Sequence, residues 1–468
     1  MKKLILILAL FFASFLNSQA LLSDSLIGSI PVQEFIDEDI PGAIYDVDVY
    51  KIVYSTLTPQ GETTIASGLL SIPQVSCDLP AFVYCHGTVF LKSDVPSNFN
   101  PEGWLGAAAA SNGYVSILPD YLGLGDSPGL HPYVHAESQA EASFHMIRAA
   151  EEFCANNNVN LNGQLFLTGY SQGGHASMGL LKYIEEYAPD DFTMNTLAAV
   201  CGSGPYDISG EQANMVLDNV PYPTGSYLPY VLLSYQSVYG NLYNDISEIF
   251  ESPFDMDIPP LFDGLHNAGE IQSFIPAIPS QMLTEMAVEA MQDSMHPINI
   301  ALRDNDLWNW VPQTPVRMIY CTGDEQVTYL NSLKAEAYMQ DNGAPNATAL
   351  MAGTGDHGDC FEPYILNTLI WFDQLREDCI TSLEDPSVLN WDVYPNPTER
   401  KLFLSFEGDN ADEVNVSIID LTGQVKYDQV FLSSNALIEI DMHDLVKGIY
   451  LLQIQKNDFI ETKRIIRN

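Results

Sequence analysis

The sequence is poor in basic residues. It has 18 lysines and arginines against 61 aspartates and glutamates, which gives a formal net charge of -43. A chain with this charge repels the phosphates of nucleic acids and the headgroups of anionic membranes. We therefore exclude nucleic acid as a partner and interpret the acidity as a solubility feature of a protein that works outside the cell.

Long apolar runs are also scarce. The most pronounced one extends from Leu4 to Leu16, after Lys2 and Lys3, and is followed by the small residues that a signal peptidase requires, Ser18-Gln19-Ala20. This run is too short to span a bilayer comfortably, and no later stretch approaches about 20 apolar residues. Residues 1–20 are predicted to be a signal peptide, and we expect an exported protein without a transmembrane span.

The seven cysteines lack any CxxC pair, so neither a zinc ribbon nor a redox dithiol is indicated. Cys360 and Cys379 flank a predicted helix of about 17 residues, roughly 26 Å long, which prevents a disulfide between them. A pair among Cys77, Cys154 and Cys379 is possible, because all three fall near one end of the predicted sheet. Three cysteines end predicted strands and are expected to be buried thiols: Cys85, Cys201 and Cys321.

Strand and helix patterns alternate over most of the 468 residues. Residues 45–73 predict two strands around the turn Pro59-Gln60-Gly61-Glu62. Short apolar strands then alternate with helices predicted near 138–156, 171–187 and 329–340. The predicted strands are "AFVYCHG", "YVSILPD", "QLFLTGYS", "LAAVCGSG", "VRMIYCTGD" and "ATALMAGTG". Apolar strands separated by helices favour a mostly parallel sheet covered on both faces, the α/β class, over residues 21–385.

Residues 206–312 interrupt this alternation with a segment far longer than an ordinary connection. It is rich in Tyr, Phe, Met and Pro, as in "GSYLPYVLLSYQSVYGNLY". The segment is either a helical subdomain with its own small core or a cap that lines an apolar pocket over an active site, and it can be both. We favour the cap.

From Leu389 the pattern changes to short alternating strands with polar turns and no helical periodicity. This pattern predicts a small β-sandwich over residues 390–468. The linker is expected near "REDCITSLEDPSVLN".

Ser171 occupies the centre of a Gly-x-Ser-x-Gly motif, from Gly169 to Gly173, after the strand "QLFLTG" and before a predicted helix. A serine among glycines is often only a turn residue, but strand, sharp turn and helix together are typical of a nucleophile elbow. Glycines 169 and 173 remove side chains that would collide across the turn. The helix start places the Gln172 N–H beside a developing oxyanion.

A serine nucleophile needs a base and an orienting acid, which follow it in the order acid, then histidine. His357 fits the base, because it lies in the Gly-rich loop "AGTGDHGDC" after a strand. Asp324, in the equivalent loop "CTGDEQV" one strand earlier, is the predicted acid, with Glu325 as the alternative. Asp324 could instead be a turn or helix-capping residue.

A second oxyanion donor is expected from the loop "FVYCHGTVF". Gly87 permits a tight backbone there, and the Thr88 N–H is the predicted donor, with its hydroxyl as a possible helper. His86 precedes the nucleophile in the chain, so we expect it to support the loop rather than act as the base.

A run of acidic and histidine residues after "YVSILPD" raises the question of a metal site. The run has no recognised ligand spacing, so a turn-rich loop is the better interpretation. The acidic stretch "IDEDIPG" is interpreted as a solvated loop rather than a calcium site. We expect no metal and no cofactor. The residues of the run are Asp120, Asp126, His131, His135 and Glu137.

Residues 45–378 resemble the α/β-hydrolase superfamily, and within it the secretory lipase branch of carboxylic ester hydrolases. The resemblance rests on "VYCHGT", "PDYLGLGDSPGLHPYVH", "GYSQGGHAS", "CTGDEQV" and "GDHGDC", in that order. It implies a Ser-Asp-His triad at Ser171, Asp324 and His357 and a lid formed by the insert. The family includes lipases and short-chain esterases, so it leaves the substrate length open.

The last 80 residues resemble a type IX secretion sorting domain, on the stretches "YPNPT", "DLTGQV", "LVKGIYLLQI" and the basic ending "KRIIRN". The resemblance implies transport across the outer membrane by the type IX machinery, followed by release or attachment to the cell surface. A spacer or carbohydrate-binding sandwich is the alternative.

The sequence thus predicts a secreted serine carboxylic ester hydrolase that acts on a small-molecule or lipid ester through an acyl-enzyme. A secreted serine peptidase of the same fold is the alternative enzyme. A catalytically silent binding protein is the alternative without activity, and labelling of Ser171 by a fluorophosphonate would exclude it.

Overall fold

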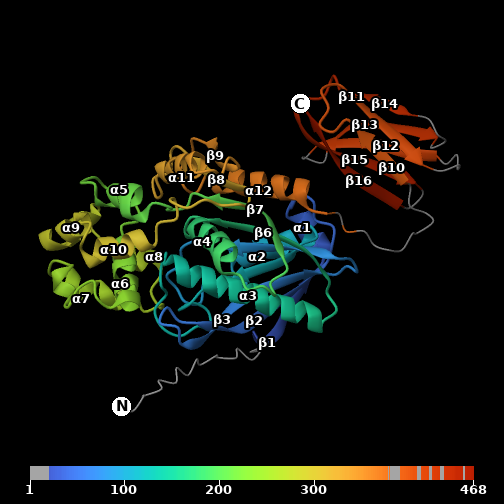
Figure 1. The fold of residues 1–468 in the computed structure, drawn as a ribbon. Helices are drawn as coiled ribbons and strands as arrows, with labels where there is room; N and C mark the ends of the chain where they lie inside the picture. Colours follow the sequence, from blue (N-terminus) through green and yellow to red (C-terminus); the bar gives the residue numbers. More distant parts are fainter. Residues whose placement is uncertain are drawn as a thin grey trace, which may run out of the picture. The chain divides into compact units, whose positions relative to one another are not determined.

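Two units make up the chain, Met1–Ile380 and Thr381–Asn468 (Figure 1). The computed structural model describes residues 20–377, 379, 390–407, 413–420, 424–432, 437–456 and 459–468. Apart from Ala20, the predicted signal peptide lies outside the described residues, as does most of the predicted linker.

The first unit is built on a nine-stranded sheet with the order β1-β2-β3-β5-β4-β6-β7-β8-β9. The first three strands and β5 pair antiparallel, and every pairing from β5 to β9 is parallel. The mostly parallel sheet predicted from the sequence is therefore confirmed. The strands are β1 (Leu21–Ile30), β2 (Val47–Leu57), β3 (Thr63–Pro73), β4 (Leu79–Cys85), β5 (Val115–Pro119), β6 (Leu161–Tyr170), β7 (Asn195–Gly202), β8 (Val316–Cys321) and β9 (Ala347–Gly353).

Helices cover both faces of this sheet (Figure 1). On one face, Phe153, Met178 and Met339 join the apolar core between the sheet and α3, α4 and α11. On the other face, Phe35 and Phe372 belong to the core formed with α1, α2 and α12. No helix among the described residues is long and apolar enough to cross a membrane. The helices are α1 (Val32–Asp37), α2 (Pro101–Ser111), α3 (Ala136–Asn156), α4 (Gln172–Tyr187), α11 (Leu330–Asp341) and α12 (Phe361–Leu375).

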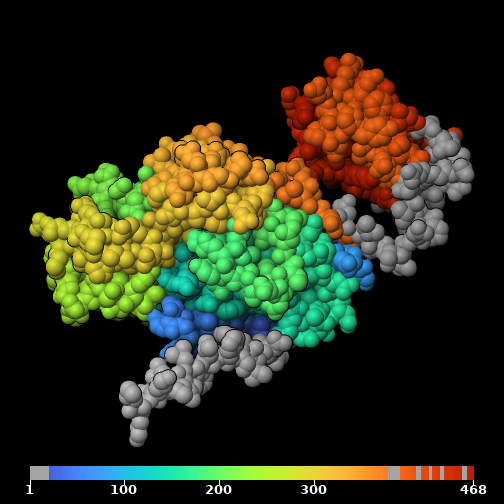
Figure 2. Space-filling view, in the orientation of Figure 1, coloured from blue at the N-terminus to red at the C-terminus, as the bar shows by residue number. Residues whose placement is uncertain are grey.

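The long connection between β7 and β8 is a lobe of short helices with its own apolar core. Figure 2 shows this lobe, in yellow-green and yellow, at one end of the first unit. Phe90, Tyr133 and Val134 from loops of the sheet domain belong to the same core, so the lobe packs on those loops. Its helices are α5 (Ala213–Leu217), α6 (Tyr227–Tyr239), α7 (Phe254–Asp257), α8 (Ala268–Gln272), α9 (Glu285–Gln292) and α10 (Pro297–Asp304).

Two disulfides cross-link the first unit. Cys77 is bonded to Cys379, one of the pairs that the sequence leaves possible. Cys321 is bonded to Cys360, so the prediction of a buried thiol at Cys321 is wrong. Cys321 ends β8 and Cys360 immediately precedes α12, and the fold brings these two ends together although 39 residues separate them. The remaining cysteines are buried and free, namely Cys85, Cys154 and Cys201.

The second unit consists of two antiparallel sheets, β10-β11-β14 and β13-β12-β15-β16. Apolar side chains from both sheets, including Trp391, Leu404 and Leu452, form one core. This is the small β-sandwich that the sequence predicts. The strands are β10 (Asn390–Tyr394), β11 (Lys401–Glu407), β12 (Glu413–Asp420), β13 (Val425–Leu432), β14 (Ile438–Asp441), β15 (Gly448–Lys456) and β16 (Phe459–Arg467).

Candidate active site

Ser171 lies in the sharp turn between β6 and α4. Its backbone has φ 59° and ψ -121°, a strained conformation for a residue with a side chain. A Cβ atom on Gly169 would collide with the Gly173 carbonyl, and one on Gly173 would collide with the Cys85 carbonyl. Both glycines are therefore required by close backbone contacts, and the turn has the geometry of a nucleophile elbow.

His357 and Asp324 lie in neighbouring loops at the carboxyl ends of β9 and β8. The His357 Nδ1 atom is 2.8 Å from Asp324 Oδ2, and both side chains are largely buried. Asp324 Oδ1 accepts hydrogen bonds from the N–H groups of Gln326 and Val327, which fix the carboxylate. With Nδ1 donating to Asp324, Nε2 is the ring nitrogen that remains to accept a proton.

Glu325, the alternative acid, has a different partner. Its carboxylate accepts the backbone N–H of His357 at 3.0 Å and thus holds the histidine loop rather than the imidazole. The Tyr170 hydroxyl donates to the His357 carbonyl at 2.6 Å, and the two rings lie 5.0 Å apart. His357 is thereby held beside the turn that carries Ser171.

Ser171, Asp324 and His357 are each 7% exposed. No hydrogen bond joins the Ser171 hydroxyl to the His357 imidazole among the residues that the structure describes. Catalytic hydrogen bonds are often long in the free enzyme and tighten when substrate binds. The structure thus brings Asp324 and His357 into contact and leaves the final approach of Ser171 open.

The two predicted oxyanion donors are the backbone N–H groups of Thr88 and Gln172. Within the described part of the chain, the backbone N–H groups of Thr88 and Gln172 have no hydrogen-bond partner. The Thr88 loop is held by Glu102, whose carboxylate accepts the Gly87 N–H at 3.1 Å, and burial raises the pKa of this carboxyl. His86 contacts the carbonyl oxygens of Gly87 and Asp120, which is the supporting role expected for it.

Two residues of the loop before α3 join the site, and their roles do not follow from the sequence pattern. The Tyr133 hydroxyl lies 2.9 Å from the Thr88 hydroxyl. His131 Nδ1 donates to the Leu122 carbonyl, so its Nε2 accepts from the Gln172 amide at 2.7 Å. Burial lowers the pKa of His131 to about 3, which keeps the ring neutral.

The acidic and histidine run predicted from the sequence lies in this same loop and at the start of α3. No group of three or more potential metal ligands occurs among the described residues. Asp120 accepts hydrogen bonds from Ser67 and Ser97, Asp126 pairs with Lys51, and His135 caps α3. The side chains of Asp120, Asp126 and His135 therefore have separate structural partners.

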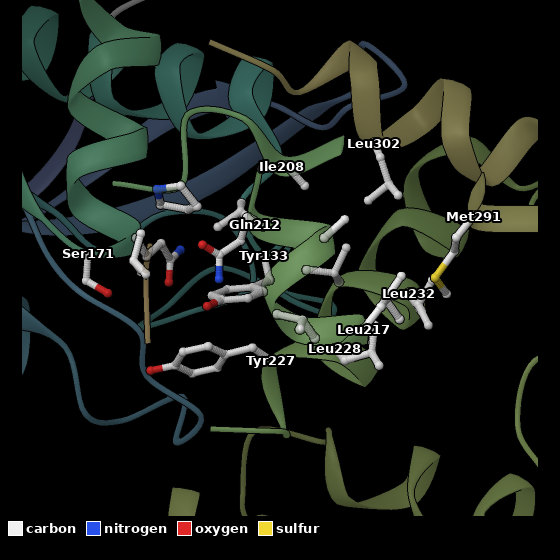
Figure 3. Close-up of a pocket in the computed structure, with 17 residues that line it drawn as sticks. Tyr133, Ser171, Ile208, Gln212, Leu217, Tyr227, Leu228, Leu232, Met291 and Leu302 are labelled. Atoms are coloured by element: carbon white, nitrogen blue, oxygen red, sulfur yellow. The ribbon is translucent and has the colours of Figure 1, made fainter. Parts of the chain in front are cut away.

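An apolar pocket extends from Ser171 into the helical lobe. Figure 3 shows Ser171 at one end, Tyr133, Gln212 and Tyr227 along the middle, and Met291 and Leu302 at the far end. The lobe also contacts the acid loop, since the Tyr222 hydroxyl donates to the Gln326 carbonyl. A strained serine, a histidine–carboxylate pair and a covering helical lobe on this sheet define an α/β-hydrolase.

Comparison with protein-family models identifies the branch. The secretory lipase family matches residues 101–373, which is more than half of the chain, so the chain belongs to the secretory lipase family and is a carboxylic ester hydrolase. The secretion system C-terminal sorting domain matches residues 392–468. Together they identify an exported protein that is secreted or held at the cell surface. A comparison with curated protein sequences found no significant match.

Solved structures resemble the first unit. A protein from Legionella pneumophila assigned to the hydrolases is 28% identical with a TM-score of 0.71, and the match covers 77% of this chain and 100% of that one. The rice cell wall degrading esterase LipA from Xanthomonas oryzae, in a ligand-bound form, is 26% identical with a TM-score of 0.68, covering 76% and 98%. Lipase A from Candida antarctica shares the fold, at 14% identity and a TM-score of 0.56, over 76% and 81%.

Proposed function

We propose that the protein hydrolyses carboxylic esters through a covalent acyl-enzyme on Ser171. His357 Nε2 removes the hydroxyl proton while Ser171 Oγ attacks the ester carbonyl, and Asp324 orients the imidazole and stabilises its protonated form. The Thr88 and Gln172 N–H groups bind the oxyanion of the tetrahedral intermediate. His357 then protonates the leaving alcohol, and a water molecule activated by the same imidazole releases the acid.

The observation that carries this proposal is the contact of 2.8 Å between His357 Nδ1 and Asp324 Oδ2, beside a serine with a strained backbone. The N–H groups of Thr88 and Gln172, which have no hydrogen-bond partner among the described residues, support the oxyanion role. The acid and the histidine lie in separate loops after separate strands, β8 and β9. No cofactor is needed for this chemistry.

The lining of the pocket favours an aliphatic acyl group as the part of the substrate that binds inside the lobe. Its walls beyond Ser171 are almost entirely apolar, and it ends at Met291 and Leu302 (Figure 3). Removing an acyl chain from water into such a pocket is favourable by about 0.8 kcal/mol for each buried CH₂ group. We therefore propose esters of aliphatic acids, rather than peptides, as substrates.

The Ser171→Ala variant tests the nucleophile. It should reduce the hydrolysis of p-nitrophenyl esters by a factor on the order of 10⁴ or more while circular dichroism and thermal stability stay unchanged. The wild-type protein should be labelled by a fluorophosphonate on Ser171, with mass spectrometry identifying the modified peptide. Full turnover by the variant would exclude Ser171 as the nucleophile.

A series of esters from acetyl to palmitoyl tests the acyl pocket. The specificity constant should rise with chain length until the chain reaches the end of the pocket and then fall. Activity that is highest for acetyl esters and declines steadily would contradict binding of the acyl chain in the pocket.

We further propose that the second unit is recognised by type IX secretion machinery, as its match to the sorting-domain family supports. Deleting residues 392–468 should leave an active enzyme in the periplasm of a host that has this machinery. Export of the truncated protein to the medium at the wild-type level would contradict the assignment.

A further inference from the structure

We propose that the Cys321–Cys360 disulfide is a positioning element of the active site, which holds the acid loop and the histidine loop in register. This role rests on the proposed function, because it concerns the alignment of Asp324 with His357. Cys321 precedes the acid by three residues, and Cys360 follows the histidine by three residues. The two loops are therefore joined twice. The hydrogen bond between Asp324 and His357 joins them at the site, and the disulfide joins them three residues away from each of these side chains.

Other contacts between the two loops are short-range, among them the hydrogen bond from the Thr322 N–H to the Gly353 carbonyl at 3.1 Å. Gly323 packs against the carbonyl groups of Thr354 and Gly355, so closely that a Cβ atom would collide with both. Glu325 accepts the backbone N–H of His357. These contacts are polar or simply steric, and they involve short loop segments rather than a packed apolar interface.

The strand that carries the histidine loop adds little packing of its own. β9 is the edge strand of the sheet, and its side chains Leu350 and Met351 are 37% and 54% exposed. Cys321 and Cys360, in contrast, are almost fully buried in the core that includes Tyr364 and Phe372. The disulfide thus links the loop that follows this edge strand to the buried core next to the site.

Small shifts between catalytic groups have large effects on turnover. A displacement of about 1 Å can lower the rate by a factor of roughly 100. A link three residues from each catalytic side chain limits such displacement. The other disulfide, Cys77–Cys379, lacks this relationship, because Cys77 precedes β4 and therefore lies at the amino end of the parallel strands, opposite the catalytic loops.

The two disulfides provide a matched comparison. Cys77–Cys379 closes a loop of 302 residues and Cys321–Cys360 one of 39 residues, so loss of the former should lower the melting temperature more. The Cys321→Ala/Cys360→Ala variant should nevertheless lower kcat roughly 10- to 100-fold, with KM changed less than threefold. The Cys77→Ala/Cys379→Ala variant should keep kcat within about twofold of the wild type, measured well below its melting temperature.

A second variant separates positioning from stability. Cys321→Val/Cys360→Ala refills the buried space of the two sulfur atoms without the covalent link. If the disulfide positions the catalytic loops, this variant should have a higher melting temperature than the double alanine variant but the same low kcat. If stability and kcat recover together, or if the double alanine variant retains the wild-type kcat, the disulfide has only a structural role.

Nuclear magnetic resonance gives an independent readout. A proton shared between His357 Nδ1 and Asp324 should resonate far downfield in the wild type and in the Cys77→Ala/Cys379→Ala variant. Its signal should be lost or broadened in both variants that lack the Cys321–Cys360 link, and an unchanged signal there would contradict the proposal. The Ser171→Ala variant tests the proposed catalytic function separately. If this variant kept full activity, both the catalytic proposal and the positioning role of the disulfide would be wrong.

Discussion

The Tyr133 hydroxyl lies 2.9 Å from the Thr88 hydroxyl, in the pocket that contains Ser171. The ring of Tyr133 is stacked on Tyr230 at 4.4 Å, so the hydroxyl group is held by a rigid aromatic pair. We propose that the Tyr133 hydroxyl donates to Thr88, which leaves the threonine hydroxyl proton free to donate in turn to an oxyanion. In this proposal Tyr133 is a positioning residue for the predicted oxyanion site.

The Tyr133→Phe variant removes this hydroxyl and keeps the stacked ring. We expect kcat to fall roughly 3- to 10-fold with KM nearly unchanged, the size of one neutral hydrogen bond. Tyr230→Phe is the matched control, since its hydroxyl donates to the Val89 carbonyl and does not contact Thr88. Steady-state kinetics on one ester compares the two, and an equal loss in both variants would contradict the positioning role.

The different contacts of Asp324 and Glu325 predict different losses on neutralisation. Asp324→Asn should lower kcat by a factor on the order of 10⁴, because an amide cannot stabilise the protonated imidazole and favours the wrong tautomer. Glu325→Gln should lower kcat by less than about tenfold, since an amide oxygen can still accept the His357 N–H. A larger loss for Glu325→Gln would reverse the assignment of the acid.

Leu302 lies at the far end of the pocket. We therefore expect substitutions of Leu302 to change the acyl chain length that the enzyme prefers. Leu302→Phe should shorten the pocket and lower the specificity constant for the longest accepted esters by roughly tenfold, with acetyl esters unaffected. Leu302→Ala should shift the optimum to longer chains, at a stability cost of about 2–5 kcal/mol. If both variants keep the wild-type profile, the acyl chain does not reach this end.

We expect the Asp306 carboxyl to make the free energy of unfolding depend on pH. The Asp306 carboxylate accepts hydrogen bonds from the N–H and the hydroxyl of Ser209, and these bonds join the two ends of the helical lobe. Burial raises the pKa of Asp306 to about 6. Because the folded protein holds this proton more tightly than the unfolded chain, its stabilisation is complete below about pH 4 and is lost as the pH rises through 6.

Asp306→Asn mimics the protonated acid at every pH. Relative to the wild type, it should be equally stable near pH 4 and more stable above pH 6, by about 3 kcal/mol at most. Thermal unfolding of both proteins from pH 4 to 8 measures this difference. A difference that does not change with pH would show that Asp306 does not titrate in this range.

Much of the fold can be read from local patterns. The period-two alternation of residues 45–73 predicts β2 and β3, and the apolar runs predict the parallel strands, because strand and helix periodicity reflect which side chains face the core. β1 and α2 are not predicted. β1 has mainly exposed side chains and α2 is rich in alanine, so neither has the contrast between apolar and polar positions on which such a prediction depends.

The sequence by itself determined the glycine-flanked turn at Ser171, the helical insert and the C-terminal unit, since each is a local pattern, and it predicted the order of serine, acid and histidine. Only the tertiary structure decided that Asp324 rather than Glu325 contacts the imidazole, that Tyr133 meets Thr88, and that Cys321 is bonded to Cys360. These are contacts between loops that follow different strands. Such contacts depend on how the whole sheet twists and packs, and no short stretch of residues contains that information.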